Sequence, residues 1–241
     1  MRIIGVIPAR YNSSRYPGKP LANINGKSMI ERVYKQAKKC KLLSDVIVAT
    51  DHQIIFDEVI SFGGKVEMTS EHNSGTERCN ELVQKIKGDF DILINIQGDV
   101  PYINPKQIHQ IANIFTCKET KIGTLVKKIE TIDELLDENI VKVIVDNNYA
   151  LDFSRLTETN INNINTDSFL IDNIFYKHIG IYGYRITVLK EICKLKQTPR
   201  EKKEKLEQLR WLENSYEIKV SETMLESKSV DVPKDIEKLN L

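Results

Sequence analysis

The segment that decides the fold lies near the start of the chain, where residues 4–20 read IGVIPARYNSSRYPGKP. Residues 3–7 are apolar and too few for a core helix, which is typical of a buried strand. The loop that follows is rich in Ser and Gly and carries Arg10, Arg15 and Lys19. Backbone N–H groups of such a turn can wrap phosphate oxygens, and its cations neutralise their charge. We therefore predict a phosphate site here, against the alternative of a solvated surface turn.

The loop follows neither of the common phosphate-binding motifs. The Gly-x-x-x-x-Gly-Lys-Ser/Thr pattern of a P-loop is absent, and so is the Gly-x-Gly-x-x-Gly pattern of dinucleotide-binding proteins. The first thirty residues nevertheless contain five basic side chains and no acidic one. The prediction of a bound polyanion rests on that charge and on the place of the loop after a strand.

Short β-branched runs alternate with amphipathic stretches through the first half of the chain. The periodicity predicts strands at 3–7, 45–50, 65–68 and 91–96, and helices at 28–40, 53–61, 75–87 and from 104 onward. This alternation is typical of an α/β protein with a mostly parallel sheet and helices on both faces. Ligands of such sheets bind beyond the carboxyl ends of the strands, where segments 10–20, 50–52 and 97–101 should converge.

The pattern changes near residue 121. Strand-like runs at 140–145, 149–153 and 179–184 follow with little helix between them, and the stretch 160–172, rich in Asn and Asp, is typical of a loop. Helices near 186 and 202, a strand near 218 and a last helix from 233 are expected. We predict a single domain over residues 1–241, with an inserted β region at about 125–185 that forms a homodimer contact.

The composition points to a globular protein that has no general affinity for nucleic acid. The 241 residues carry a net charge of +1, whereas nucleic-acid binders usually have a strong basic excess. No apolar run reaches the roughly 18 residues of a membrane span, and Pro8 and Arg10 end the first apolar run too early for a signal peptide. The four cysteines are too far apart for a zinc knuckle or a redox dithiol, so we expect free thiols and a cytoplasmic location.

Two aspartates are candidate metal ligands. Asp99 ends the segment Gln97-Gly98-Asp99 after a predicted strand. A nucleoside triphosphate is one such polyanion, and a carboxylate that faces it there is a natural Mg²⁺ ligand. The alternative is an Asp that caps the next turn. Asp231 is the second candidate, although Asp before Pro233 is also an ordinary start signal for a helix.

A further candidate binding segment is Ser74-Gly75-Thr76-Glu77-Arg78, at the start of a predicted helix. Gly75 leaves room there for a base or a ribose, and Arg78 points back from the first turn. The spacing of Ser74 and Glu77 also fits a capping box. His178, taken alone, fits a buried structural histidine better than a functional one.

Taken together, these segments resemble the 3-deoxy-manno-octulosonate (Kdo) cytidylyltransferase family. The matching segments run in family order and cover nearly the whole chain: 7–11, 14–15, 17–21, 24–27, 29–30, 48–51, 68–69, 74–78, 97–99, 153–155, 178–182, 206–210 and 230–231. The resemblance implies a mostly parallel, Rossmann-like nucleotidyltransferase sheet and an enzyme that uses CTP and Mg²⁺.

The resemblance also implies a role for each matched position. The catalytic residues would be Asp99, Arg10, Lys19 and Asp231, of which Asp99 and Asp231 would hold Mg²⁺. The nucleotide-binding residues would be Arg10, Ser13, Arg15, Lys19, Ser74, Gly75, Arg78 and Gln97. The sugar-binding residues would be Gln97, Arg155, His178, Tyr182, Glu207 and Gln208.

The chain departs from the family pattern in two places, the second of which is expected near the sugar. Position 100 is Val where the family usually has Glu, and after Ser154-Arg155 no further Arg or Lys occurs until Lys177. Glu158, Asp167 and Asp172 lie in between and would suit the ammonium group of an amino sugar, or they are solvated loop charges.

We therefore predict that the chain activates a 3-deoxy-2-ulosonic acid with CTP to give the CMP-sugar and pyrophosphate, for lipopolysaccharide synthesis. The alternatives are CMP activation of another ulosonic acid, such as 8-amino-Kdo or a sialic acid, and a non-catalytic nucleotide-binding protein.

Overall fold

The strand predicted at the start of the chain lies inside a parallel group of strands. In the computed structural model, which describes residues 1–13, 15–156, 170, 173–237 and 239, β1 (Ile3–Ala9) pairs in parallel with β4 (Asp45–Thr50) and β6 (Ile92–Asn95). The strand β5 (Val66–Met68) continues this group beyond β4. The loops after β1, β4 and β6 therefore leave the sheet at the same edge, as predicted.

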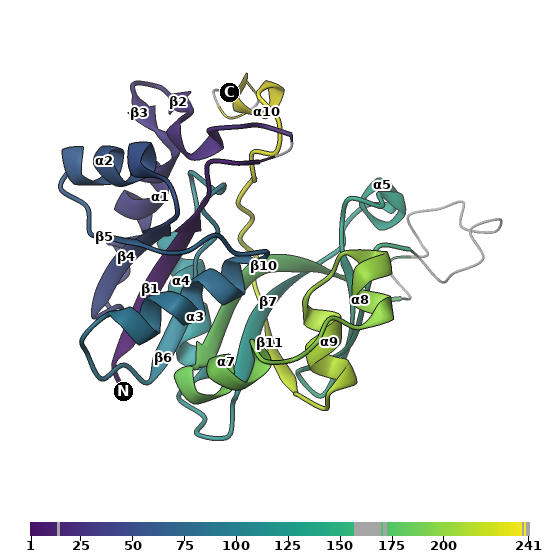
Figure 1. Ribbon diagram of the computed structural model, residues 1–241. Helices are drawn as coiled ribbons and strands as arrows, with labels where there is room; N and C mark the ends of the chain where they lie inside the picture. The colour runs from purple at the N-terminus through teal and green to yellow at the C-terminus, as the bar shows by residue number, and fades with distance from the viewer. Residues whose placement is uncertain (14, 157–169, 171–172, 238, 240–241) are drawn as a thin grey trace.

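The later strands continue the same sheet (Figure 1). They are β7 (Ile122–Lys128), β8 (Lys142–Asp146), β9 (Tyr149–Ser154), β10 (Tyr176–Arg185) and β11 (Ile218–Glu222). The strand order is β5-β4-β1-β6-β10-β7-β11-β9-β8. Because β10 runs antiparallel to both neighbours and β9 runs antiparallel to β11 and β8, the other strands of this sheet share one direction. The predicted mostly parallel α/β fold is confirmed.

Helices cover both faces of the sheet, because each has an apolar stripe that must be buried. One face is covered by α1 (Met29–Ala37), α2 (Gln53–Ser61) and α4 (Pro105–Ile114). The other face is covered by α3 (Gly75–Lys85), α7 (Ile186–Ile192) and α9 (Gln208–Glu213), with α8 (Pro199–Glu204) just before α9. Within the described residues, every helix is too short or too polar to cross a bilayer.

Several elements were not predicted. The strand β7 is buried along almost its whole length, so its sequence lacks the alternation of a half-exposed strand. The hairpin of β2 (Asn23–Ile24) and β3 (Lys27–Ser28) turns at Asn25-Gly26, where both residues have positive φ. Asn-Gly is the expected sequence for that turn. The short helices η1 (Lys19–Leu21) and α5 (Ile132–Leu136) are too short to leave a periodic pattern.

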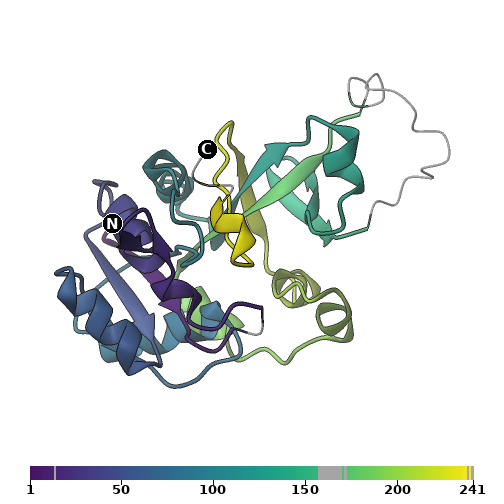
Figure 2. The same ribbon diagram turned by 90° about the horizontal axis from the view of Figure 1, so that it is seen from above.

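The last part of the chain returns from the β region to the N-terminal half. Residues 223–233, which we call the C-terminal segment, connect β11 to α10 (Lys234–Glu237). Figure 2 shows α10 between the N-terminal half and the β region. The Val230 side chain is fully buried in a cluster with Ile24 and Met29. This packing brings Asp231 to the edge of the sheet that carries the β1 loop.

Candidate active site

The loop after β1 turns Lys19 toward the edge of the sheet. Gly18 has φ 69°, a left-handed conformation that glycine adopts without strain, and its N–H donates to the carbonyl of Tyr11 at 2.9 Å. The helix η1 begins at the next residue. The Pro17-Gly18 turn thus directs Lys19, ten residues after the end of β1, toward the edge of the sheet.

Lys19 contacts both predicted metal ligands. Its Nζ lies 2.7 Å from Oδ2 of Asp99 and 3.9 Å from Oδ1 of Asp231, and it donates to the carbonyl of Val230 at 2.9 Å. Arg15 Nη2 lies 2.7 Å from the same Oδ1 of Asp231. The structure therefore joins two of the three cations of the loop, Arg15 and Lys19, to the two aspartates.

A close approach of backbones holds Asp99 in this position. A Cβ atom at Gly98 would lie 2.8 Å from the carbonyl oxygen of Pro8, so only glycine fits there without a shift of the backbone. The Asp99 carbonyl accepts a hydrogen bond from the Val230 N–H at 2.9 Å. The end of β6 is thus fixed against the end of β1 on one side and against the C-terminal segment on the other.

A cavity of about 270 Å³ lies beside these groups, and we call it the loop cavity. All eight residues predicted to bind the nucleotide line it: Arg10, Ser13, Arg15, Lys19, Ser74, Gly75, Arg78 and Gln97. Asp99 and Asp231 line it as well. Its lining thus holds four basic and two acidic side chains, so it favours a polyanion.

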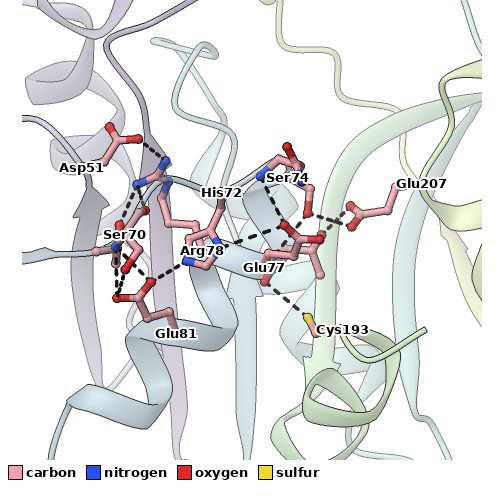
Figure 3. Close-up of polar contacts among 12 residues, drawn as sticks. Asp51, Ser70, His72, Ser74, Glu77, Arg78, Glu81, Cys193 and Glu207 are labelled. Atoms are coloured by element: carbon pink, nitrogen blue, oxygen red, sulfur yellow. Dashed lines mark hydrogen bonds and ion pairs between the residues drawn. The ribbon is translucent and has the colours of Figure 1, made fainter. Parts of the chain in front are cut away.

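The N-terminus of α3 forms one wall of the loop cavity. The hydroxyl of Ser74 caps the helix by accepting from the N–H of Glu77 at 3.2 Å, which confirms the N-cap part of the predicted capping box. The Glu77 carboxylate accepts instead from the N–H of Asn73 at 3.2 Å, one residue before the cap. The Ser74 hydroxyl donates in turn to Glu207 Oε1 at 2.8 Å, and the Thr76 hydroxyl donates to Oε2 at 2.7 Å (Figure 3). The positive end of the helix dipole is therefore presented to the cavity.

Arg78 is buried and ties three elements together. Its guanidinium donates to Asp51 Oδ2 and to the Thr69 hydroxyl, both at 2.6 Å, and to the carbonyl of Ser70 at 3.2 Å (Figure 3). The helix α3 is thereby fixed to the ends of β4 and β5. Although Arg78 lines the cavity, these bonds use three of the five N–H groups of its guanidinium.

A second cavity of about 670 Å³ lies on the side of the β region, and we call it the β-region cavity. Residues 177–182 of β10 and 226–229 of the C-terminal segment line it, together with Gln107 of α4. It shares Gln97, Asp99 and Asp231 with the loop cavity. The two cavities therefore meet at the pair of aspartates.

An irregularity in β10 forms a wall of the β-region cavity. The pairing with β7 shifts between Ile179 and Tyr182, and the Thr124 hydroxyl donates to the freed carbonyl of Ile181 at 2.8 Å. The lone pairs of the Thr124 hydroxyl oxygen can then accept a hydrogen bond from Nε2–H of His178 at 3.0 Å. Burial among aromatic rings lowers the pKa of His178 to about 4, so the imidazole is neutral near pH 7.

Of the residues predicted to bind the sugar, Gln97, His178 and Tyr182 line the β-region cavity. The Arg155 guanidinium donates to the carbonyls of Glu138 and Asn139, the second of which lines that cavity.

The two predicted residues at the start of α9 lie elsewhere. Glu207 lines a separate cavity of about 340 Å³ with Ser74, and burial raises the pKa of its carboxyl despite the hydrogen bonds from Thr76 and Ser74. Gln208 is buried in α9. The structure thus does not bring Arg155, Glu207 and Gln208 into the lining of the β-region cavity. Ser14, Glu158, Asp167 and Asp172 and most of the loop at 160–172 lie outside the described residues.

Sequence reasoning did not identify Lys177 and Glu226 as lining residues. The Lys177 side chain is 5% exposed and is paired with Glu134 and, at 2.8 Å, with Glu226 Oε1. Glu226 Oε2 accepts from Lys127 at 3.2 Å. Lys177 precedes the motif residue His178 and could have been noted, whereas no local pattern marks Glu226.

Comparison with known proteins decides the family. The family model for cytidylyltransferases matches residues 4–222. A 3-deoxy-manno-octulosonate cytidylyltransferase of Parabacteroides distasonis is 50% identical over 244 residues, which cover 99% of this chain and 96% of the relative. The chain belongs to the 3-deoxy-manno-octulosonate cytidylyltransferase family. The family resemblance seen in the sequence is confirmed, and the chain is a nucleotidyltransferase.

Two further comparisons place this cytidylyltransferase among its relatives. The enzyme of the same name from Bacteroides thetaiotaomicron is 48% identical over 242 residues, and the alignment covers 98% of this chain and 96% of that relative. A solved structure of CMP:2-keto-3-deoxy-manno-octonic acid synthetase complexed with CTP aligns with a TM-score of 0.90 at 37% identity, covering 99% of this chain and 97% of that one. The similarity therefore extends over both halves of the sheet.

Proposed function

We propose that this cytidylyltransferase transfers CMP from CTP to the anomeric C2 hydroxyl of Kdo and releases pyrophosphate, as a step in lipopolysaccharide synthesis. The observation that carries the proposal is the meeting of two cavities at Asp99 and Asp231. A polyanion suits the cationic loop cavity, and a polar sugar suits the larger β-region cavity. The hydroxyl and the α-phosphorus would then meet at the junction, where positioning supplies much of the rate acceleration.

The loop cavity offers the groups that a triphosphate needs. Arg10, Arg15 and Lys19 carry charge that can balance the phosphate oxygens, and the capped N-terminus of α3 adds a favourable dipole. Charge that grows on the phosphoryl oxygens in the transition state would be met by cations already in place.

In the β-region cavity, Gln97 at the junction can bind the sugar by hydrogen bonds from its amide. His178 is neutral there, so it can contribute a hydrogen bond but not a positive charge.

Asp99 and Asp231 fit a divalent cation. Both carboxylates lie near the same Lys19 ammonium group, at 2.7 Å and 3.9 Å, which supports a shared position for a cation. Mg²⁺ prefers one or two carboxylates together with phosphate oxygens, and within the described residues no larger cluster of His, Cys, Asp and Glu offers an alternative. When bound, Mg²⁺ would neutralise charge on the phosphates.

We also propose a cytoplasmic homodimer. The cysteines at 40, 79, 117 and 193 are free thiols, as expected of a reducing compartment. The strands β8 and β9, at the end of the sheet, carry Ile144 and Leu151 with 52% and 58% of their surface exposed. Two such apolar side chains on neighbouring strands support a contact with a second subunit.

The decisive test is pyrophosphate release by the purified protein with each of the four nucleoside triphosphates against Kdo, 8-amino-Kdo and a sialic acid. We expect turnover with CTP and Kdo, and its loss in Asp99→Asn, whose thermal unfolding should stay close to wild type because Asp99 is part-exposed. Preference for another sugar would replace Kdo in the proposal. Failure of every pair while CTP still binds would leave a non-catalytic nucleotide-binding protein.

A further inference from the structure

The two aspartates assigned above to a metal ion are each paired with a cation of the chain itself. Lys19 Nζ contacts Asp99 at 2.7 Å and Asp231 at 3.9 Å, and Arg15 contacts Asp231 at 2.7 Å. Lys19 is also held by the carbonyl of Val230 at 2.9 Å. The proposed function assigns the same two cations, together with Arg10, to the triphosphate. Lys19 and Arg15 therefore each have two competing kinds of partner, an aspartate carboxylate and a phosphate group.

Charge balance indicates which ligand can enter first. Arg15, Lys19, Asp99 and Asp231 together carry no net charge, so a free divalent cation gains little attraction from this group. To bind, it would have to displace Lys19, whose side chain is only 14% exposed, from Asp99, whose side chain is 29% exposed. Partial burial strengthens that ion pair relative to one in open solvent.

A triphosphate, unlike a free divalent cation, is attracted by the charge of this site. The loop cavity also contains Arg10, so its lining attracts an anion. Phosphate oxygens can replace carboxylate oxygens as partners of Lys19 and Arg15. Once both cations have moved, Asp99 and Asp231 are two unpaired like charges beside a shared position. That arrangement favours a divalent cation.

We propose that Lys19, assisted by Arg15, is paired with Asp99 and Asp231 in the free protein and moves to the triphosphate when CTP binds. The two carboxylates therefore become available to a divalent cation only in the nucleotide complex. The proposal rests on the proposed function. It gives Lys19 a positioning role besides phosphate binding, and it means that the metal ion enters with the nucleotide or after it.

The experiment measures Mn²⁺ binding, by the electron paramagnetic resonance signal of free Mn²⁺, to protein without nucleotide. We expect weak binding to the wild type and binding about tenfold tighter or more to Lys19→Met, because the ammonium that competes for the carboxylates is gone. Arg15→Met should have a smaller effect, since the Arg15 side chain is 64% exposed. A non-hydrolysable CTP analogue, α,β-methylene-CTP, should tighten Mn²⁺ binding to the wild type.

Three variants serve as controls. Lys65→Met removes the cation of a separate pair, with Asp45 at 2.6 Å, and should leave Mn²⁺ binding at the wild-type level. Lys19→Arg keeps a cation and should keep weak binding. The double variant Lys19→Met with Asp99→Asn should lose the gained Mn²⁺ site.

Two results would overturn the proposal: unchanged Mn²⁺ affinity in folded Lys19→Met, or equal Mn²⁺ affinity of the wild type with and without the nucleotide analogue. Because the analogue binds Mn²⁺ by itself, the second comparison counts only Mn²⁺ bound beyond that held by the analogue alone and by Asp99→Asn with the analogue, and it decides the matter even if Lys19→Met fails to fold. The measurements on free protein need neither sugar nor turnover. A failure of the proposed function would appear separately, as absent pyrophosphate release with CTP and Kdo.

Discussion

At the scale of single residues, His178 shows how surroundings set the chemistry of a side chain. Its ring lies 5.4 Å from that of Phe153 and 5.1 Å from that of Tyr182, between centroids. Burial in this apolar group disfavours the charged form and lowers the pKa of His178 from 6.5 to about 4. The residue that the family motif assigns to the sugar therefore enters the site as a neutral hydrogen-bonding group.

The depressed pKa of His178 predicts a loss of stability in acid. Between pH 6.5 and pH 4 the histidine of the unfolded chain takes up a proton, whereas that of the folded chain remains neutral, so protons favour the unfolded state. The free energy of unfolding should fall over this interval as the pH is lowered. In His178→Gln the fall should be smaller. Urea unfolding at a series of pH values measures both slopes.

A second histidine provides the matched control for that titration. His109 is exposed on α4 and contacts Asn113 within its own helix. His109→Gln should reproduce the wild-type pH dependence. Equal acid slopes in wild type and His178→Gln would mean that the imidazole is not kept neutral by burial.

At the scale of elements, the C-terminal segment joins the two halves of the site. Thr223 N–H donates to the carbonyl of Val126 on β7, and Gln107 of α4 donates to the carbonyl of Leu225. Glu226 then bridges Lys177 and Lys127 with its two oxygens. Burial, which raises the pKa of Glu226, is outweighed by the hydrogen bonds from the two lysines, which lower it. The segment that carries Asp231 is thus fixed to β7, β10 and α4.

Removal of the Glu226 charge should loosen this segment. In Glu226→Gln the two lysines, which are 5% and 10% exposed, each lose a carboxylate partner. We expect the free energy of unfolding to fall by about 1–2 kcal/mol and amide hydrogen exchange in residues 223–231 to become faster. Chemical unfolding and hydrogen–deuterium exchange measure the two effects.

The control for Glu226 removes a more exposed partner of the same lysine. Glu130 lies 3.3 Å from Lys127 and is 57% exposed, so Glu130→Gln should cost less than about 1 kcal/mol and leave the exchange of the segment unchanged. Equal effects of the two variants would show that Glu226 has no particular role in holding the segment.

At the scale of the whole molecule, one continuous sheet carries both cavities. The parallel strands β1, β4 and β6 supply the loop cavity, and β10, inserted antiparallel between β6 and β7, supplies a wall of the β-region cavity. Because β10 pairs directly with β6, Gln97 after β6 and His178 on β10 line the same space. A rigid hydrogen-bonded ladder therefore sets the distance between the two proposed substrates.

The exposed apolar side chains of β8 and β9 predict a dimer at this scale. We expect sedimentation equilibrium to give twice the 27.7 kDa mass of the chain. Leu151→Asp should shift the protein to the monomer, because a charge is costly in a contact that excludes water. Leu42→Asp changes a side chain that is 40% exposed in the N-terminal half and should leave the dimer intact. A monomeric wild type would refute the contact.

The sequence by itself determined the features that depend on neighbouring residues. Alternation of apolar runs predicted β1, β4, β6 and the helices between them, because burial of a strand or of a helix face requires apolar residues at regular spacing in the sequence. Ser74 and Glu77 identified the start of α3. The cations of residues 10–19 and the rule that ligands bind at strand ends predicted the loop cavity, whose lining contains each residue named for the nucleotide.

Only the tertiary structure decided how distant residues combine. The contacts of Lys19 with Asp99 and of Ser74 with Glu207 join residues 80 and 133 positions apart, and no local period encodes such a pairing. The same holds for the shift in β10 that places His178 against Thr124, and for the bridge of Glu226 between two lysines. These features depend on strand order and on burial. Both follow from packing the whole sheet, so the charge state of His178 and the pairing of the aspartates could be read only from the folded chain.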